Sequence, residues 1–232
     1  MSPDDRPECA IFDVEGTLVD CVPLILESWR ATLQEAGHSF THLDLQPYSG
    51  MDGSWMLEQL LPKEPAATRE ALLKAQGERY RAHFIERAQA FPAVRALFET
   101  LKHLGVRIGI ATTCKADELA IYESRLGVLD MADAISCGDV VKHGKPDPAL
   151  LIHCHRSLDL ENPSRAVVIG DTPFDALAAK GAQMRAVGVL TGGFAAASLM
   201  DAGCEDIFDQ VEQTRRLWHS NGAFAATTSA PD

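Results

Sequence analysis

Two carboxylates stand two positions apart in the segment Asp13-Val14-Glu15-Gly16-Thr17. Such positions point to the same side of an extended chain, so Asp13 and Glu15 can face one pocket while Val14 packs behind them. One carboxylate of such a pair can stay ionised as a nucleophile or metal ligand, while the other, with a raised pKa, transfers protons. The alternative interpretation is a polar turn after a strand, which Gly16 would permit.

A second acidic group stands in the segment VIGDTPFDA, residues 168–176. Thr172 or Asp171 can cap a helix that begins at Pro173, and Asp175 then returns to the face of Asp171. Carboxylate oxygens suit Mg²⁺, which keeps some of its waters for a phosphorylated substrate. Helix capping explains either aspartate alone, but a second acidic cluster after another strand favours a cation site.

Two further positions could bind an anion. Thr112, with Thr113 beside it, ends the apolar run 108–111 and offers a hydroxyl and nearby backbone N–H groups. Lys145 stands in HGKPDP, residues 143–148, where a glycine and two prolines make a rigid loop that could hold an ammonium over the carboxylates. The more ordinary interpretation of Lys145 alone is a solvated lysine in a turn.

Short apolar runs precede most of these residues. The runs span 9–12, 106–111, 134–137, 166–169 and 186–190, and helical patterns between and after them span 92–104, 116–126, 148–158 and 174–180. This alternation predicts an α/β fold with a parallel sheet buried on both faces. Because ligands bind beyond the carboxyl ends of such strands, we expect Asp13, Thr112 and Asp171 to share one edge of the sheet.

The alternation stops from about Cys21 to Ala88, where apolar residues recur at helical spacing. The sequence therefore predicts a discontinuous core of residues 1–20 and 89–219 with an inserted helical domain of residues 21–88. A polar stretch at 48–53 separates the helices of this insert. Residues 220–232 are small and polar, and we expect them to form a flexible tail.

Composition excludes several classes of protein. The chain has 232 residues, 46% of them apolar and 23% charged, which is typical of a globular protein. Its formal charge of −12 disfavours nucleic acid and anionic membranes as partners. No apolar run approaches the roughly 20 residues of a membrane-spanning helix, the amino terminus is acidic, and the six cysteines form no C-x-x-C pair. We expect a cytoplasmic protein with reduced thiols.

Taken in order, FDVEGTLVD, IGIATT, KHGKPDP and VIGDTPFDA resemble the four motifs of the haloacid dehalogenase (HAD) superfamily of hydrolases. The resemblance covers nearly the whole chain and implies a Rossmann-like core with a helical cap, as in its phosphoglycolate-phosphatase-like branch. It implies that Asp13 is the nucleophile, that Glu15 is the general acid and base, and that Thr112 and Lys145 bind phosphate. The implied Mg²⁺ site comprises Asp13, Glu15 through its backbone carbonyl, Asp171 and Asp175, and the implied substrate contacts are Thr112, Thr113, Lys145, Gly50 and Met51.

One position departs from the family pattern, because most phosphatases of this superfamily have aspartate where this chain has Glu15. The longer side chain must fold back, or the leaving group must sit differently, for proton transfer. We favour a Mg²⁺-dependent phosphatase that acts on a small phosphorylated metabolite through an aspartyl-phosphate, as a monomer or homodimer. The alternatives are a β-phosphoglucomutase-like phosphotransferase and, because of Glu15, a non-catalytic metabolite-binding module.

Overall fold

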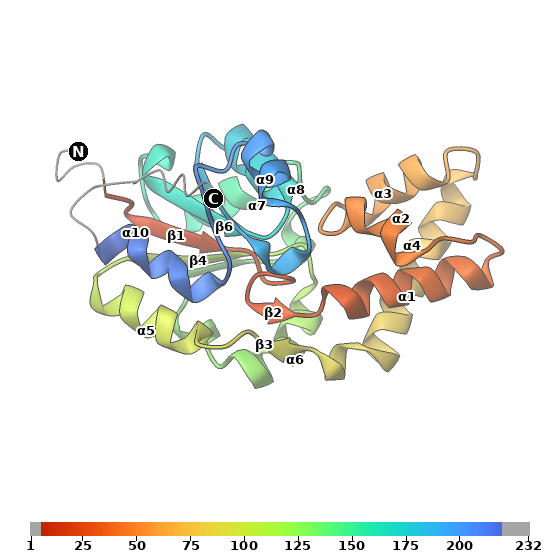
Figure 1. Cartoon of the computed structure of the whole chain (residues 1–232), viewed down its shortest axis with the longest axis horizontal. Coiled ribbons are helices and arrows are strands. Elements are labelled where there is room, and N and C mark those ends of the chain that lie inside the picture. The colour runs from red at the N-terminus through yellow and green to blue at the C-terminus, as the bar shows by residue number, and fades with distance from the viewer. Residues whose placement is uncertain (1–5, 220–232) are drawn as a thin grey trace, which may run out of the picture.

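The computed structural model of the protein describes residues 6–219, so the predicted tail at 220–232 lies outside the described residues (Figure 1). The strands are β1 (Cys9–Phe12), β2 (Val19–Asp20), β3 (Gln89–Ala90), β4 (Arg107–Ala111), β5 (Ala134–Ser136), β6 (Ala166–Gly170), β7 (Arg185–Val189) and β8 (Asp206–Phe208). The helices are α1 (Val22–Glu35), α2 (His42–Leu45), α3 (Gly53–Leu60), α4 (Ala66–His83), α5 (Val94–His103), α6 (Ala116–Leu126), α7 (Ala149–Ser157), α8 (Pro173–Gly181), α9 (Ala196–Ala202) and α10 (Arg216–His219).

A parallel sheet in the order β5-β4-β1-β6-β7-β8 forms the centre of the fold, which confirms the predicted α/β class. Phe12 pairs in register with Ile110 of β4 and Ile169 of β6. The chain therefore leaves all three strands at the same edge. The sequence did not predict β8, because this edge strand has only three residues and too few apolar positions for a pattern.

Helices cover both faces of the sheet. Ala10 and Phe12 of β1 pack on the side of α5 and α6, and the Phe12 ring lies 5.0 Å from that of Phe98. Cys9 and Ile11 pack on the opposite side, with α7 and α8. This alternation of faces explains why the strands are continuous apolar runs in the sequence.

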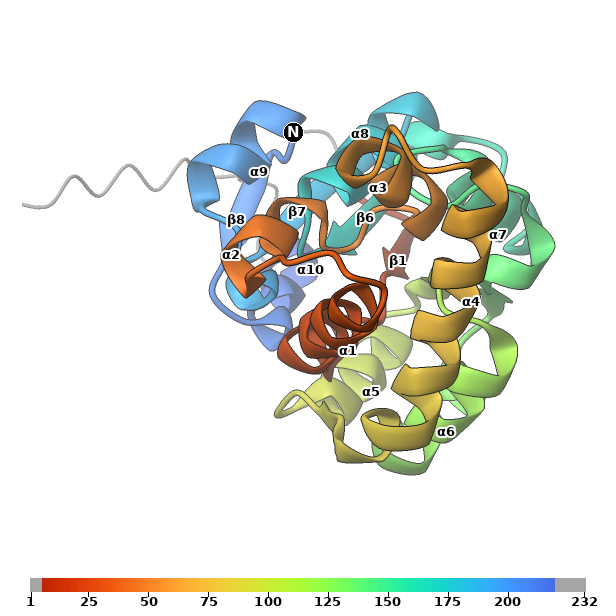
Figure 2. The ribbon, with the colours of Figure 1, turned by 90° about the vertical axis from the view of Figure 1, so that its right-hand side faces the viewer.

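Helices α1 to α4 lie beyond the carboxyl ends of the sheet strands (Figures 1 and 2). They have a hydrophobic cluster of their own, which includes Trp29, Leu33 and Leu57. Strands β2 and β3 pair antiparallel where the chain leaves the core and where it returns. The helical segment, residues 21–88, therefore lies next to the edge of the sheet at which Asp13 lies.

All six cysteines are buried, and none forms a disulfide within residues 6–219. Among the helices of these residues, none combines the length and the apolar character needed to cross a membrane.

Candidate active site

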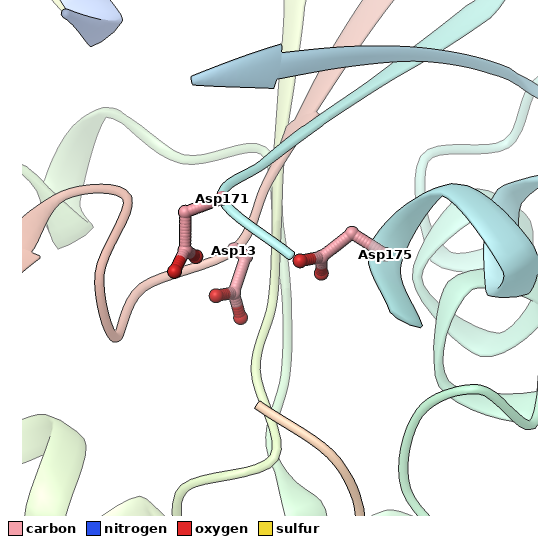
Figure 3. A group of neighbouring side chains, drawn as sticks. All are labelled: Asp13, Asp171 and Asp175. Atoms are coloured by element: carbon pink, nitrogen blue, oxygen red, sulfur yellow. The ribbon is translucent and has the colours of Figure 1, made fainter. Parts of the chain in front are cut away.

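Three buried carboxylates meet at the carboxyl ends of two neighbouring strands. Asp13 directly follows β1, Asp171 directly follows β6, and Asp175 lies in the first turn of α8. One oxygen of each lies within 4.8 Å of the others, and Figure 3 shows the three side chains turned toward a common space. Their exposed fractions are only 4%, 0% and 3%. We call this group the acidic cluster.

The start of helix α8 fixes Asp175 in the acidic cluster. Of the two cap residues that the sequence allows, Thr172 and Asp171, the N-cap is Thr172, and its side chain accepts a hydrogen bond from the Asp175 amide. The Asp175 carboxylate accepts bonds of 3.1 Å from the Thr172 amide and 2.7 Å from its hydroxyl. Pro173 begins the helix with a preset φ. This capping box orients Asp175 before any ligand binds.

Lys145 joins two members of the acidic cluster. Its Nζ lies 2.7 Å from Asp13 Oδ1 and 2.7 Å from Asp175 Oδ1, and the side chain is only 2% exposed. Burial lowers the pKa of the Lys145 ammonium, but the two carboxylates raise it above its ordinary value. Burial raises the pKa of Asp13 to about 6 despite this contact. A single ammonium therefore compensates only part of the buried negative charge.

Asp171 has an oxygen that the protein leaves unpaired. Thr17 donates to Asp171 Oδ1 at 2.9 Å, whereas Asp171 Oδ2 has no hydrogen-bond partner among the described residues. A Cβ at Gly16, whose φ is +88°, would lie 2.2 Å from this oxygen, so the backbone approaches it closely. Burial, followed by the charge of Asp13, raises the pKa of Asp171 well above its ordinary value.

The donor set of the acidic cluster fits a hard cation. An unpaired, fully buried carboxylate oxygen is costly unless a positive charge compensates it. Asp13, Asp171 and Asp175 would hold such an ion. A divalent cation bound there would supply the positive charge that allows a phosphate group to approach the carboxylates.

The Glu15 side chain takes a different direction from the acidic cluster. Its Oε1 accepts a hydrogen bond of 2.9 Å from the Tyr122 hydroxyl, which lies 2.7 Å from the Tyr80 hydroxyl. Burial, followed by the nearby charge of Glu118, raises the pKa of Glu15 to about 8. The resemblance assigns the backbone carbonyl of Glu15, and not its carboxylate, to the metal site. In the structure the carboxylate binds Tyr122 instead of joining the acidic cluster.

A cavity of about 490 Å³ lies between the helical segment and the edge of the sheet. Residues from both sides line it, among them Glu15, Thr113 and Gly144 on the side of the sheet, and Gly50 and Met51 on the other. These include three of the residues that the resemblance implies as substrate contacts. Thr112 is fully buried and is not among the residues that line this cavity, and its hydroxyl accepts a bond of 3.2 Å from the Cys114 amide.

Sequence reasoning missed Asp52, which attaches the helical segment to the loop of Lys145. Its carboxylate caps α3 and accepts a bond of 2.7 Å from the Gly144 amide, while its own amide donates to the Lys145 carbonyl at 2.8 Å. Burial alone would raise the pKa of Asp52, but the Gly144 amide and Ser54 lower it. The cap of α3 was detectable as Asp-Gly-Ser before a helix, but the contact with Gly144 was not.

Thr17, Tyr122 and Tyr80 were also not assigned a role from the sequence. Thr17 stands within the first motif, so its proximity to the acidic residues was available as a signal. The tyrosines carry no local signal, because each lies within a helix, Tyr80 in α4 and Tyr122 in α6, and their hydrogen-bond partners are 42 and 107 residues away in the sequence.

The parallel sheet, with the buried acidic cluster and its lysine at the carboxyl edge, defines an α/β protein with a candidate cation and phosphate site. Residues 10–189 match the family model described as haloacid dehalogenase-like hydrolase. The chain belongs to this family, and this confirms the resemblance of its four motifs.

Named relatives and a solved structure are similar over most of the chain. A phosphoglycolate phosphatase of Xanthomonas campestris pv. campestris is 31% identical over 188 residues, which cover 80% of this chain and 84% of the relative. The fructose-1-phosphate phosphatase of Escherichia coli K12 is 28% identical over 77% of this chain and 94% of the relative. The crystal structure of a hydrolase from Pseudomonas syringae has a TM-score of 0.83 and 26% identity, and the match covers 90% of this chain and 96% of that one.

Proposed function

We propose that this protein is a Mg²⁺-dependent phosphatase that hydrolyses a small phosphorylated metabolite through an aspartyl-phosphate on Asp13. The observation that carries the proposal is the acidic cluster, in which Lys145 bridges two carboxylates and Asp171 Oδ2 stays unpaired. Relatives named as phosphatases support a hydrolase that acts on phosphate esters.

The proposed reaction assigns one task to each group. The Asp13 carboxylate attacks phosphorus, the bond to the leaving oxygen breaks, and Glu15 gives that oxygen a proton. Glu15 then takes a proton from the water that attacks the aspartyl-phosphate, so Asp13 is regenerated and phosphate leaves. Lys145 neutralises the transferred group, and Thr112 with its neighbouring amides binds its oxygens. Mg²⁺ at the acidic cluster would supply the rest of the positive charge.

We propose further that the helical segment, residues 21–88, acts as a cap domain over this site. Asp52 holds it against the Lys145 loop, and the cavity beneath it has walls from both parts of the chain. Closure of such a segment excludes bulk water from the reacting groups. Gly50, Met51 and Thr113 would contact the substrate, and phosphoglycolate and sugar phosphates, named for the relatives, are the first candidates.

Replacement of the nucleophile tests the proposal. Asp13→Asn removes the attacking charge at constant shape, so hydrolysis of phosphoglycolate and of p-nitrophenyl phosphate should fall by about a thousandfold or more. The same activities of the wild-type protein should disappear in EDTA and return with Mg²⁺. Asp159→Asn is a matched control, because Asp159 is exposed and its φ of 54° suits asparagine.

The outcomes separate the alternatives. An Asp13→Asn protein that keeps its full rate would exclude Asp13 as the nucleophile. Thermal stabilisation by a metabolite without any turnover would support a binding module instead. Release of an isomerised sugar phosphate without free phosphate would support a phosphotransferase.

A further inference from the structure

We propose that Tyr122 and Tyr80 are positioning residues for Glu15, a buried pair of phenols that holds its carboxylate at the cavity wall and links its position to helix α4. The inference rests on the proposed function, since it gives Glu15 the role of proton donor. It concerns the one motif position at which this chain departs from most of the superfamily.

The three groups form an unbroken hydrogen-bonded chain across the molecule. Glu15 follows β1, Tyr122 lies in α6, and Tyr80 lies near the end of α4 in the helical segment. The Tyr122 hydroxyl donates to Glu15 Oε1 at 2.9 Å and lies 2.7 Å from the Tyr80 hydroxyl. Tyr122 and Tyr80 are 0% and 3% exposed, so water cannot readily replace these bonds.

The number of protons on each hydroxyl determines which group donates in these hydrogen bonds. A tyrosine hydroxyl has one proton, and Tyr122 donates this proton to Glu15. Tyr122 must therefore accept the bond that joins it to Tyr80, and Tyr80 is the donor. Both phenols point their protons toward the carboxylate, which restrains the carboxylate more strongly than a single bond would.

The length of the Glu15 side chain matches this arrangement. An aspartate at position 15 would withdraw the carboxylate by about one carbon–carbon bond, roughly 1.5 Å. The bond of 2.9 Å to Tyr122 would then exceed hydrogen-bond distance. Tyr122 is therefore within reach of a glutamate at position 15 but not of an aspartate. The hydrogen bonds of the two tyrosines restrict the conformational freedom that the additional methylene of glutamate would otherwise introduce.

A second contact holds α4 in the position that Tyr80 requires. Arg81, the next residue of α4, forms an ion pair of 3.1 Å with Glu118 of α6. Tyr80 itself packs in the hydrophobic cluster of the sheet together with Tyr122 and Val14, although its helix belongs to the helical segment. The placement of Glu15 therefore depends on the docking of α4 against α6.

The reaction offers a readout that a purely structural role would not change. An alkyl phosphate needs a proton on its leaving oxygen, whereas p-nitrophenolate leaves without one. Misplacement of Glu15 should therefore slow phosphoenzyme formation from alkyl esters and spare it for p-nitrophenyl phosphate. The parameter kcat/KM reports this step for both substrates, because transfer to Asp13 is the first irreversible event.

The experiment compares Tyr122→Phe, Tyr80→Phe and Ser28→Ala in the full-length, Mg²⁺-loaded protein. Tyr122→Phe should lower kcat/KM by about tenfold or more for phosphoglycolate or a sugar phosphate, and by less than about twofold for p-nitrophenyl phosphate. Tyr80→Phe should lower kcat/KM for phosphoglycolate or a sugar phosphate by about threefold. Ser28→Ala, which removes another buried hydroxyl of the helical segment, should change neither. Equal losses for both substrates in Tyr122→Phe would overturn the inference.

A double-mutant cycle tests the match of lengths. In a Glu15→Asp background, Tyr122→Phe should have almost no effect on kcat/KM for alkyl esters, because the shorter carboxylate no longer reaches the phenol. The same tenfold loss in both backgrounds would show that Tyr122 acts through another group. A wild-type protein that hydrolyses neither substrate would instead refute the proposed function, so the two failures are distinguishable.

Discussion

At the scale of single residues, the acidic cluster is a buried charge that the protein itself compensates only in part. Asp13, Asp171 and Asp175 are nearly inaccessible to water, and Lys145 contacts the first and the last of them. Burial of uncompensated carboxylates costs free energy, which appears here as the raised pKa values of Asp13 and Asp171. A bound cation would remove this cost, so metal binding and stability should be coupled.

Replacement of Asp171 should separate the cost of the buried carboxylate from the stabilisation by a bound metal ion. Without metal, Asp171→Asn removes one buried charge and keeps an acceptor for Thr17, so the free energy of unfolding should rise by about 1 to 3 kcal/mol. With Mg²⁺ at a hundredfold excess over its Kd, the wild-type protein should gain about 2.7 kcal/mol, and the variant should gain little. Urea unfolding in EDTA and in Mg²⁺ measures both quantities.

Asp159→Asn, on an exposed loop, should respond to Mg²⁺ as the wild-type protein does. If Asp171→Asn gains as much stability from Mg²⁺ as the wild type, the cation does not bind at the acidic cluster. This readout requires no substrate, so it is independent of the proposed reaction.

At the scale of elements, the turn from β6 into α8 carries two site residues and fixes their geometry. Asp171 leaves the strand, Thr172 caps the helix, and Asp175 returns to the cap through the Thr172 amide and hydroxyl. The same carboxylate also receives Lys145, so the capping box and the ion pair share one residue. Loss of the cap should therefore affect both stability and the site.

Thr172→Ala should lower the free energy of unfolding by about 1 to 2 kcal/mol, because it removes both hydrogen bonds of the Thr172 hydroxyl. Thr172→Ser keeps the hydroxyl and should lose clearly less. Thr41 has an equivalent capping box at α2, which is only four residues long and exposed there, so Thr41→Ala should cost about 0.5 kcal/mol. Urea unfolding compares the three variants, and equal costs for Thr172→Ala and Thr172→Ser would contradict the argument.

The sequence predicts these elements wherever a local pattern determines them. The strand Cys9–Phe12 and the helix Ala116–Leu126 agree with the structure to the residue, because the first is a continuous apolar run that Asp13 ends and the second is a helical pattern that Gly127 ends. The contacts of Glu15 with Tyr122 and of Asp52 with Gly144 span 107 and 92 residues. The direction of such side chains depends on how helices pack against each other, which no local pattern records.

At the scale of the whole molecule, the net charge of −12 and the burial of carboxylates both favour the binding of protons by the folded protein. The pKa of Glu15 rises from 4.5 to about 8, and that of Asp171 lies well above its ordinary value, in both cases chiefly through burial. Between about pH 4.5 and pH 8, the folded protein therefore binds more protons than the unfolded chain does. Stability from such a group is complete below its unfolded pKa and is lost as the pH rises through its folded pKa.

The metal-free protein should therefore lose stability between pH 7 and 8.5. Glu15 alone should account for about 1 kcal/mol of this loss, since one pKa unit corresponds to about 1.4 kcal/mol and its folded pKa is about 8. Urea unfolding in EDTA at the two pH values measures the loss. Glu15→Gln, which cannot titrate, should reduce the loss by that amount, whereas Asp159→Asn should leave it unchanged. An equal loss in Glu15→Gln would show that burial does not raise the pKa of Glu15, and the carboxylate would then be ionised throughout this range.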